Sequence, residues 1–309
     1  MEVVRHIATS SRRFVAPVLT LGNFDGVHRG HQAILGRVAD VAHATGGEAV
    51  ALTFHPHPVA VLRPEHAPPL ITSLRDRLML LGGTDLDVVV LQHFTPAFAS
   101  VAAETFVEHF VVERLAATRV IVGHSVSFGQ GRRGDAALLA ALGARHGFGV
   151  EVIGPVRVDG HDVSSSAVRR AIAAGDVTLA ATLLGRPHRL SGRVVPGRRR
   201  GATIGFPTAN VAVRAGMWPP DGVYAVRMLR GDVWLDGVAN IGTNPTFGDT
   251  GRTLEVYLFD FDADIYGERV SVGFVERLRG EEAFPSVEAL VAQIARDVDD
   301  ARAVLARRA

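Results

Sequence analysis

Apolar and polar positions follow two different patterns along the chain, and the change falls near residue 185. Before it, short apolar runs that indicate buried strands alternate with segments whose apolar residues recur every three or four positions, as on one helix face. The predicted strands are 18–21, 49–54, 88–91, 120–122 and 150–153, and the predicted helices are 34–42, 74–81, 101–116, 136–145, 164–175 and 177–184. Strands that alternate with helices are typical of a doubly wound parallel sheet, an α/β fold.

After Gly185 and Pro187, short runs rich in β-branched and aromatic residues are separated by Gly, Pro, Asp and Asn. These runs are 192–195, 223–228, 233–241, 254–259 and 270–275. They predict an all-β domain, a small β-barrel. Residues 286–307 place Leu290, Val291, Ile294 and Val298 on one face, which predicts a closing C-terminal helix. We therefore expect an α/β plus all-β protein, with domains at 1–186 and 187–309.

Composition agrees with two folded domains. The chain has 309 residues, about twice the usual size of one domain. It is 47% hydrophobic and 21% charged, with a formal net charge of +1, so neither disorder nor a nucleic-acid partner is expected. The sequence contains no cysteine, which excludes disulfides and thiolate catalysis.

No feature of the sequence points to a membrane. Residues 1–13 lack the apolar core of a signal peptide. No apolar run approaches the ~20 residues that a membrane span needs. We expect a cytoplasmic protein with no membrane partner, and the sequence leaves open whether copies of it form a homo-oligomer.

The first candidate site is the stretch LGNFDGVHRGHQ, residues 21–32. A strand end, a glycine turn and a helix N-terminus together form a typical phosphate-binding arrangement, at the sheet edge where ligands bind. His28 and His31 are three residues apart and share one side of the helix, so both can donate to phosphate oxygens and stabilise a leaving pyrophosphate. A zinc site and a simple turn are the alternatives, but no third ligand stands at a familiar spacing and the usual helical histidine pair is four apart.

A second motif lies at 163–170, the stretch VSSSAVRR. Serines at a helix start are ordinary N-caps. Ser164 and Ser165 also offer hydroxyl and N–H groups to an anion, and Arg169 follows one turn later to bind phosphate. Together, the glycine-histidine loop and this helix start resemble the two signatures of the adenylyl-transferring nucleotidyltransferase superfamily. That resemblance implies a Rossmann-like fold in which the histidines meet the triphosphate of ATP and a substrate phosphate attacks its α-phosphorus.

In the β half, the most informative stretch is GRRRGATIGFPTAN, residues 197–210. It is either a glycine-rich flap over phosphates, with Gly201 and Gly205, or a solvated basic turn. Thr208 and Asn210 alternate as in a strand and face the same way, and their hydroxyl and amide oxygens suit Mg²⁺. Farther on, Glu255 lies within an apolar strand, either as an outward-facing residue or as the general base of phosphoryl transfer.

Phe206-Pro207-Thr208-Ala209-Asn210 is similar to the flavokinase signature. Over residues 15–305 the chain resembles the bacterial bifunctional riboflavin kinase/FAD synthetases. Further stretches carry this resemblance in the same order: 53–58, 183–187, 221–224, 241–247 and 262–267. The resemblance implies that the C-terminal domain makes FMN from riboflavin and ATP, and that the N-terminal domain joins FMN to AMP, giving FAD and pyrophosphate.

The resemblance also implies residue roles and small-molecule partners: ATP, riboflavin, FMN and Mg²⁺. In the N-terminal domain, His28, His31, Ser164, Ser165 and Arg169 would handle ATP, and Gly22, Phe24, Asp25 and Gly30 would shape the nucleotide pocket. In the C-terminal domain, Gly201 and Gly205 would cover phosphates. The kinase motif would consist of Pro207, Thr208 and Asn210, of which Thr208 and Asn210 would hold Mg²⁺. Glu255 would activate the 5′-hydroxyl of riboflavin.

One stretch departs from the family pattern. Residues 122–129, VGHSVSFG, stand where the family usually has Gly-x-(Asp/Asn)-Phe-x-Phe-Gly. Next to His124, Ser125 therefore replaces the amide or carboxylate of the family pattern, and Val126 replaces its aromatic ring. The alternative that this departure raises is a riboflavin kinase whose N-terminal domain is weak, regulatory or adapted to a modified flavin.

Two other interpretations explain less of the chain. An adenylyltransferase for another phosphorylated metabolite would account for the first half only. A nucleic-acid-binding barrel would need a basic face with interleaved aromatics, and the aromatic content is 6%.

Overall fold

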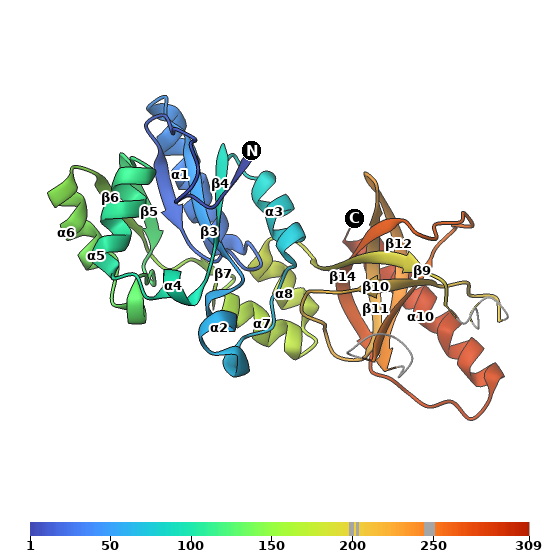
Figure 1. The fold of residues 1–309 in the computed structure, drawn as a ribbon. Coiled ribbons are helices and arrows are strands. Elements are labelled where there is room, and N and C mark those ends of the chain that lie inside the picture. The colour runs from blue at the N-terminus through green and yellow to red at the C-terminus, as the bar shows by residue number, and fades with distance from the viewer. Residues whose placement is uncertain (198–200, 202–203, 244–250, 309) are drawn as a thin grey trace. The chain divides into compact units, whose positions relative to one another are not determined.

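The computed structural model describes residues 1–197, 201, 204–243 and 251–308, which form two compact units (Figure 1). The first unit contains residues 1–69 and 74–164, and the second contains residues 70–73 and 165–309. None of the described helices combines the length and the apolar character that crossing a membrane requires.

A six-stranded parallel sheet forms the centre of the first unit, as predicted. Its strands, in spatial order, are β1 (Glu2–Arg5), β4 (Val88–His93), β3 (Ala49–His55), β2 (Val18–Leu21), β5 (Arg119–Gly123) and β6 (Gly149–Ile153). Every neighbouring pair is parallel. The chain builds outward from β2 through β3 to β4 and then returns to the other side of β2 with β5, so the order of the strands reverses between β2 and β5. Ligands of open α/β sheets bind at such a reversal, at the carboxyl ends of the strands.

Helices cover both faces of this sheet. The helices of this unit are α1 (Arg29–Ala44), α2 (Pro58–Leu62), η1 (Pro64–His66), α3 (Leu74–Gly82), α4 (Pro96–Ala99), α5 (Ala103–Phe106), η2 (Val107–Arg114), η3 (Gln130–Arg132) and α6 (Ala136–His146), and a hairpin of β7 (Arg157–Val158) and β8 (His161–Asp162) follows β6. The segment predicted as one helix over 101–116 is a short α-helix continued by the π-helix η2.

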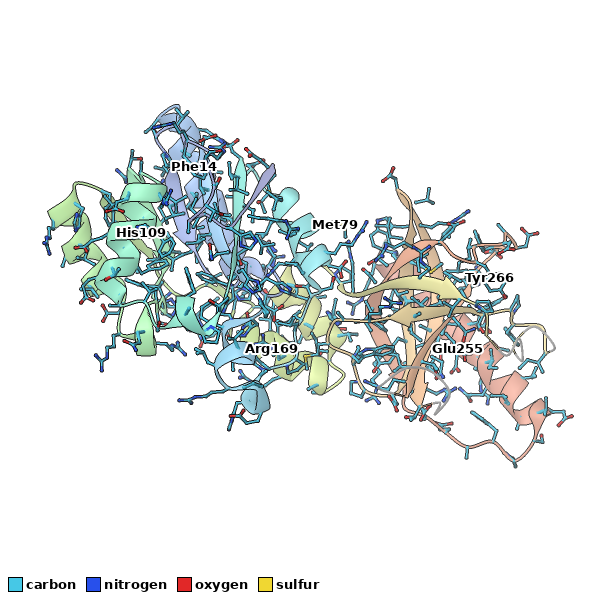
Figure 2. The ribbon with its side chains drawn as sticks, viewed as in Figure 1. Phe14, Met79, His109, Arg169, Glu255 and Tyr266 are labelled. Atoms are coloured by element: carbon cyan, nitrogen blue, oxygen red, sulfur yellow. The ribbon has the colours of Figure 1, made fainter. Side chains whose placement is uncertain are left out.

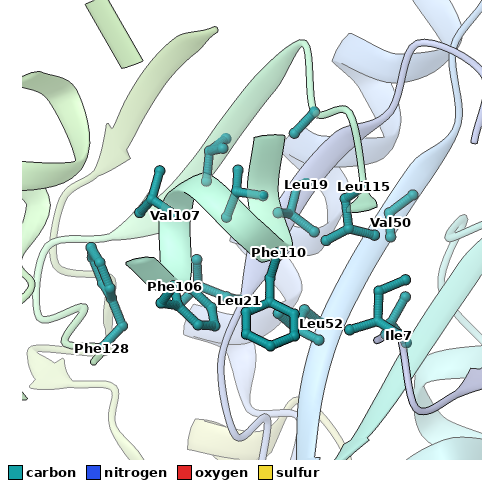
Figure 3. Packing of buried hydrophobic residues seen from close by; sticks show 14 of the residues in the cluster. Ile7, Leu19, Leu21, Val50, Leu52, Phe106, Val107, Phe110, Leu115 and Phe128 are labelled. Atoms are coloured by element: carbon teal, nitrogen blue, oxygen red, sulfur yellow. The ribbon is translucent and has the colours of Figure 1, made fainter. Parts of the chain in front are cut away.

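Successive strand residues enter opposite cores, which explains the continuous apolar runs in the sequence. Leu19 and Val50 pack with Phe106 and Phe110 on one face (Figure 3). Val18 and Ala49 pack with the α1 side chains on the other face.

The second unit contains a closed antiparallel barrel, also as predicted. Its strands run in the order β10 (Ala209–Val213), β13 (Arg252–Leu258), β12 (Val233–Thr243), β11 (Gly222–Arg230), β14 (Arg269–Arg279) and β9 (His188–Val195). Helices α7 (Ser165–Ala173) and α8 (Val177–Leu184) precede the barrel, and α10 (Val287–Arg307) closes the chain. Tyr224, Val256 and Phe274 fill the barrel interior, whereas Val223 and Val238 on its outer surface pack against α10.

An ion pair fixes α10 to the barrel. The Arg279 guanidinium at the end of β14 donates to both carboxylate oxygens of Asp297, over 2.9 and 2.7 Å, and Gln293 donates to the same carboxylate. Asp297 is 3% exposed. Breaking a buried ion pair leaves one charge without compensation, which costs about 3 kcal/mol or more.

We therefore expect Asp297→Ala to lower the free energy of unfolding by about 3 kcal/mol. Urea denaturation followed by tryptophan fluorescence measures this change, because Trp218 and Trp234 both lie in the second unit. Glu288→Ala, an acidic residue in the first turn of the same helix, is the matched control and should change little. Equal stabilities for the two variants would contradict a structural role for the Arg279–Asp297 pair.

Candidate active sites

The loop between β2 and α1 has an unusual backbone. Phe24 and Val27 both lie in the left-handed region, with φ of 49° and 41°, and Gly26 between them has φ of 81°. Such conformations are costly for residues that carry a Cβ and persist only where the surroundings hold them. The Phe24 and Val27 side chains are 1% and 2% exposed, so burial anchors the loop. Gly22 lies against the Phe24 ring, because a Cβ there would come within 3.2 Å of it.

The two histidines of this loop lie together at the N-terminus of α1. The His28 ring caps the helix, since its Nδ1 accepts a hydrogen bond from the His31 N–H over 3.2 Å. The His31 ring stacks on His28, with 3.6 Å between centroids. Because Nδ1 of His28 is an acceptor, the neutral ring carries its proton on Nε2, and that nitrogen is the donor. A donor at this place favours an anion, and the positive end of the α1 dipole favours an anion as well.

Gly30 permits this arrangement. A Cβ at Gly30 would lie 3.2 Å from Nδ1 of His28 and 3.7 Å from the carbonyl oxygen of Val163. The segment that leads to Ser164 therefore runs close to the histidine loop. Among the described residues, no group of three or more His, Asp or Glu side chains is arranged to hold a metal ion.

The stretch 53–58, which carries part of the family resemblance, adds further polar groups next to this loop. The neutral His57 ring accepts from the Val59 N–H through Nδ1, and its Nε2 lies 3.3 Å from the side-chain amide of Asn23. On the neighbouring strand end, burial and the nearby Arg77 charge lower the pKa of His55. These groups make the carboxyl edge of β2 and β3 polar, as expected of a site that receives charged ligands.

The segment that departs from the family pattern lies where the strand order reverses. Pairing between β2 and β5 stops at Leu19 and Val120, so the two strands separate toward their carboxyl ends. His124 and Ser125 follow directly after β5 and are exposed, whereas Val126 packs against the sheet core. These residues therefore lie at the carboxyl edge of the sheet, and their part in the nucleotide pocket stays a prediction.

Ser164, Ser165 and Arg169 lie in the stretch of sequence where the chain passes from the first unit to the second. Ser164 is exposed and ends the first unit, and Ser165 begins α7 in the second. Arg169 follows on the second turn of α7 and is half-buried (Figure 2). Their action together with the histidines remains a prediction.

The candidate kinase site lies on the outer surface of the barrel. Leu254 and Val256 point into the barrel, so Glu255 between them points outward from β13 (Figure 2). The Thr208 hydroxyl donates to Oε2 of Glu255 over 3.3 Å. Asn210 is the registered partner of Glu255 on β10, and Asn240 is its registered partner on β12. The structure therefore brings Thr208, Asn210 and Glu255 together, and it adds Asn240, which sequence reasoning missed.

Residues 204 and 205 form a turn before Thr208. The Phe206 N–H donates to the Gly201 carbonyl over 2.8 Å, and Gly205 has φ of 88°. A side chain at Gly201 would collide with the Phe206 carbonyl, and one at Gly197 would collide with Asn210. The Phe206 ring contacts the Tyr257 ring edge-on, which leaves Pro207 exposed at the entry to β10.

Parts of two predicted motifs lie outside the described residues. They are Arg198–Arg200 with residues 202–203 of the flap, and residues 244–247 of the stretch 241–247. For the described part of the site, the hydroxyl of Thr208 and the amide of Asn210 beside a carboxylate are hard oxygen donors. This donor set fits Mg²⁺.

Comparison with known proteins identifies both halves. The model of the FAD synthetase family matches residues 12–167, and that of the riboflavin kinase family matches residues 184–305. A solved structure from Streptococcus pneumoniae, described as a macrolide-efflux protein, is 30% identical, with a TM-score of 0.87 over 96% of this chain and 97% of its own. It therefore has the same two-part fold.

Curated relatives match over nearly their full length, and they are described as bifunctional riboflavin kinase/FMN adenylyltransferases. The protein from Haemophilus influenzae is 39% identical over 304 residues, covering 98% of this chain and 99% of its own. The protein from Escherichia coli K12 is 41% identical over 307 residues, covering 98% and 97%. The chain therefore belongs to the family of bifunctional riboflavin kinase/FMN adenylyltransferases, two-domain transferase enzymes.

Proposed function

We propose that residues 187–309 transfer the γ-phosphoryl group of ATP to riboflavin, and that residues 1–186 transfer AMP from a second ATP to the FMN formed. The observation that carries the proposal is the convergence of Thr208, Asn210 and Glu255 on one face of the barrel, in a chain that also has a histidine pair at a helix N-terminus. Each half of the chain thus has its own set of side chains suited to phosphate transfer. Because both reactions consume ATP, we propose that the enzyme works in the cytoplasm.

In the kinase reaction, Glu255 accepts the proton of the riboflavin 5′-hydroxyl as that oxygen bonds to the γ-phosphorus. The bond from the γ-phosphorus to the β–γ bridging oxygen breaks, and ADP leaves. The hydrogen bond from Thr208 holds the carboxylate in one orientation. Thr208 and Asn210 would also hold Mg²⁺, which when bound neutralises phosphate charge. The turn with Gly201, Gly205 and Pro207 shapes the approach to these groups.

In the adenylyl transfer, a phosphate oxygen of FMN bonds to the α-phosphorus of ATP, and pyrophosphate leaves. The Nε2–H of His28, the His31 ring and the positive end of α1 stabilise negative charge on the leaving group. Gly22, Phe24, Asp25 and Gly30 shape the loop that presents them. Ser164, Ser165 and Arg169 add donors for the triphosphate.

Product analysis tests both halves separately. With riboflavin, ATP and Mg²⁺, chromatography should show FMN and then FAD, and with FMN supplied in place of riboflavin it should show FAD alone. Absence of both FMN and FAD in the first reaction would refute the kinase assignment. FMN without FAD would favour the alternative in which the departures at His124, Ser125 and Val126 have left a weak or regulatory N-terminal domain, or one adapted to a modified flavin.

Removal of the metal should stop FMN formation. Because the described residues Thr208, Asn210 and Glu255 offer no positive charge to a triphosphate, we expect chelation by EDTA to abolish the reaction and excess Mg²⁺ to restore it. The rate of FMN formation with and without EDTA measures this dependence. Full activity in EDTA would contradict a metal held by Thr208 and Asn210.

A further inference from the structure

A buried arginine ties the histidine loop to the neighbouring strand. Arg77 lies in α3 and is 4% exposed. Its Nη1 donates to the carbonyl oxygen of Asn23 over 2.7 Å, and its Nη2 donates to the carbonyl oxygen of Phe54 over 2.9 Å. One planar guanidinium thus joins the loop that follows β2 to the carboxyl end of β3.

The surroundings of this guanidinium are those of a fixed structural cation. The Thr53 hydroxyl donates to the same Asn23 carbonyl over 3.2 Å, so two side chains hold that peptide. Burial lowers the pKa of Arg77, and the charge of Asp25, itself 2% exposed, opposes that change. Burying a charge is costly unless hydrogen bonds and an opposite charge compensate it, and here both come from the histidine loop or its neighbour.

Arg77 binds the loop at the residue immediately before its left-handed segment. Asn23, whose carbonyl it holds, directly precedes Phe24, the first of the residues with positive φ, and the loop ends at the His28 cap. A strained segment keeps its shape only if its surroundings hold it. The Asn23 carbonyl oxygen accepts from both Arg77 and Thr53, so the direction in which the chain enters the turn is set there.

We infer that Arg77 is a positioning residue for adenylyl transfer, which holds the Asn23–His28 loop so that the two imidazoles face the triphosphate. Arg77 acts through the loop and its carbonyls, not by touching ATP. The inference rests on the proposed function of the N-terminal domain, and it extends that site to a residue of α3 about fifty positions farther along the chain.

Steady-state kinetics of the full-length enzyme test the inference, with FMN formation as an internal reference. Arg77→Met keeps the length of the side chain and removes its donors and its charge. We expect it to lower kcat for FAD formation by about 10–100-fold, the loss that a small misplacement of catalytic groups causes, with KM for ATP changed much less. FMN formation should stay at the wild-type rate. Arg77→Lys, which keeps a cation and its N–H donors, should recover most of the lost rate.

Arg12→Met is the matched control. Arg12 forms an ion pair with Glu48 at the opposite, amino end of β3, so its loss should lower stability and leave FAD formation unchanged. Wild-type FAD formation in Arg77→Met would overturn the inference. So would a loss in Arg77→Met that Arg77→Lys does not recover and that Arg12→Met reproduces, because that result would reflect stability alone.

A second measurement is independent of turnover and separates this inference from the proposed function. The Nδ1 of His28 accepts a hydrogen bond, and its ¹⁵N chemical shift reports that bond. In spectra of the imidazole groups, with the His28 signal assigned by its loss in His28→Asn, Arg77→Met should move the signal and Arg77→Lys should return it. An unmoved signal would overturn the inference even in an enzyme that makes FAD. A moved signal in a protein that makes no FAD would support the positioning role and refute the proposed reaction.

Discussion

Glu255→Gln is expected to lower the rate of FMN formation by about 10²–10⁴-fold, the contribution of a positioned general base. Glutamine has the same shape as glutamate and its side-chain oxygen still accepts the hydrogen bond from Thr208. It cannot take the proton of the riboflavin 5′-hydroxyl. The defect should therefore appear in kcat for riboflavin phosphorylation, measured by chromatography of FMN at saturating ATP and Mg²⁺.

The same variant should still convert supplied FMN to FAD, because Glu255 belongs to the barrel. Glu276→Gln is the matched control: Glu276 lies on β14 of the same barrel, where it pairs with Arg308, and its loss should leave FMN formation unchanged. Glu255→Gln with the activity of the control would show that Glu255 is an outward-facing strand residue with no catalytic part.

The alternation of strands and helices, and the later change to short β runs, were sufficient to predict both folds. This worked because the inner strands of the parallel sheet, β2, β3, β4 and β5, are mostly buried on both faces, which leaves a continuous apolar run in the sequence. The strand β1 and the two-residue strands β7 and β8 were not predicted, and β10 was indicated only by the alternation of Thr208 and Asn210. The edge strand β1 is mostly exposed and carries Glu2 and Arg5, and β10 is five residues long and contains the polar Asn210. Neither has the apolar pattern by which a strand is recognised.

The candidate sites were predictable where one short motif holds the chemistry. His28 and His31, or Thr208 and Asn210, are close in sequence and therefore close in space. Asn240 was missed because its position beside Glu255 depends on the register between β12 and β13. Arg77 was missed because an arginine on a surface helix usually faces solvent, and only the tertiary fold places it on the Asn23 carbonyl.

The position of His124–Val126, which differ from the family pattern, indicates which reaction their difference should affect. These residues follow β5, where β2 and β5 separate, and His28 is reached from the end of β2. Substitutions far from a ligand site would not affect catalysis. Ser125 and Val126, however, lie at the point of an open α/β sheet where ligands bind. An effect of the residues at 125 and 126 should therefore be seen in the rate of FAD formation by the N-terminal domain. The effect of replacing His28 on the same rate gives the scale for comparison.

His28→Asn is expected to lower the rate of FAD formation from FMN by about 10²–10³-fold, the cost of removing one donor that stabilises charge in a transition state. Asparagine is a good N-cap and can still accept the hydrogen bond from the His31 N–H, so α1 should begin as before. Its short side chain cannot place a donor where Nε2 of His28 lies. The loss should therefore fall on catalysis and not on folding, and initial rates of pyrophosphate release with FMN and ATP measure it.

Two comparisons make the result specific. His43→Asn, at the other end of α1 where the ring contacts Asp87, should leave FAD formation unchanged. FMN formation from riboflavin should also be unchanged in His28→Asn, since the kinase site contains no residue of this loop. Undiminished pyrophosphate release in His28→Asn would mean that His28 serves only as a helix cap, because a cap is the one role that asparagine preserves and charge stabilisation through Nε2 is the one that it removes.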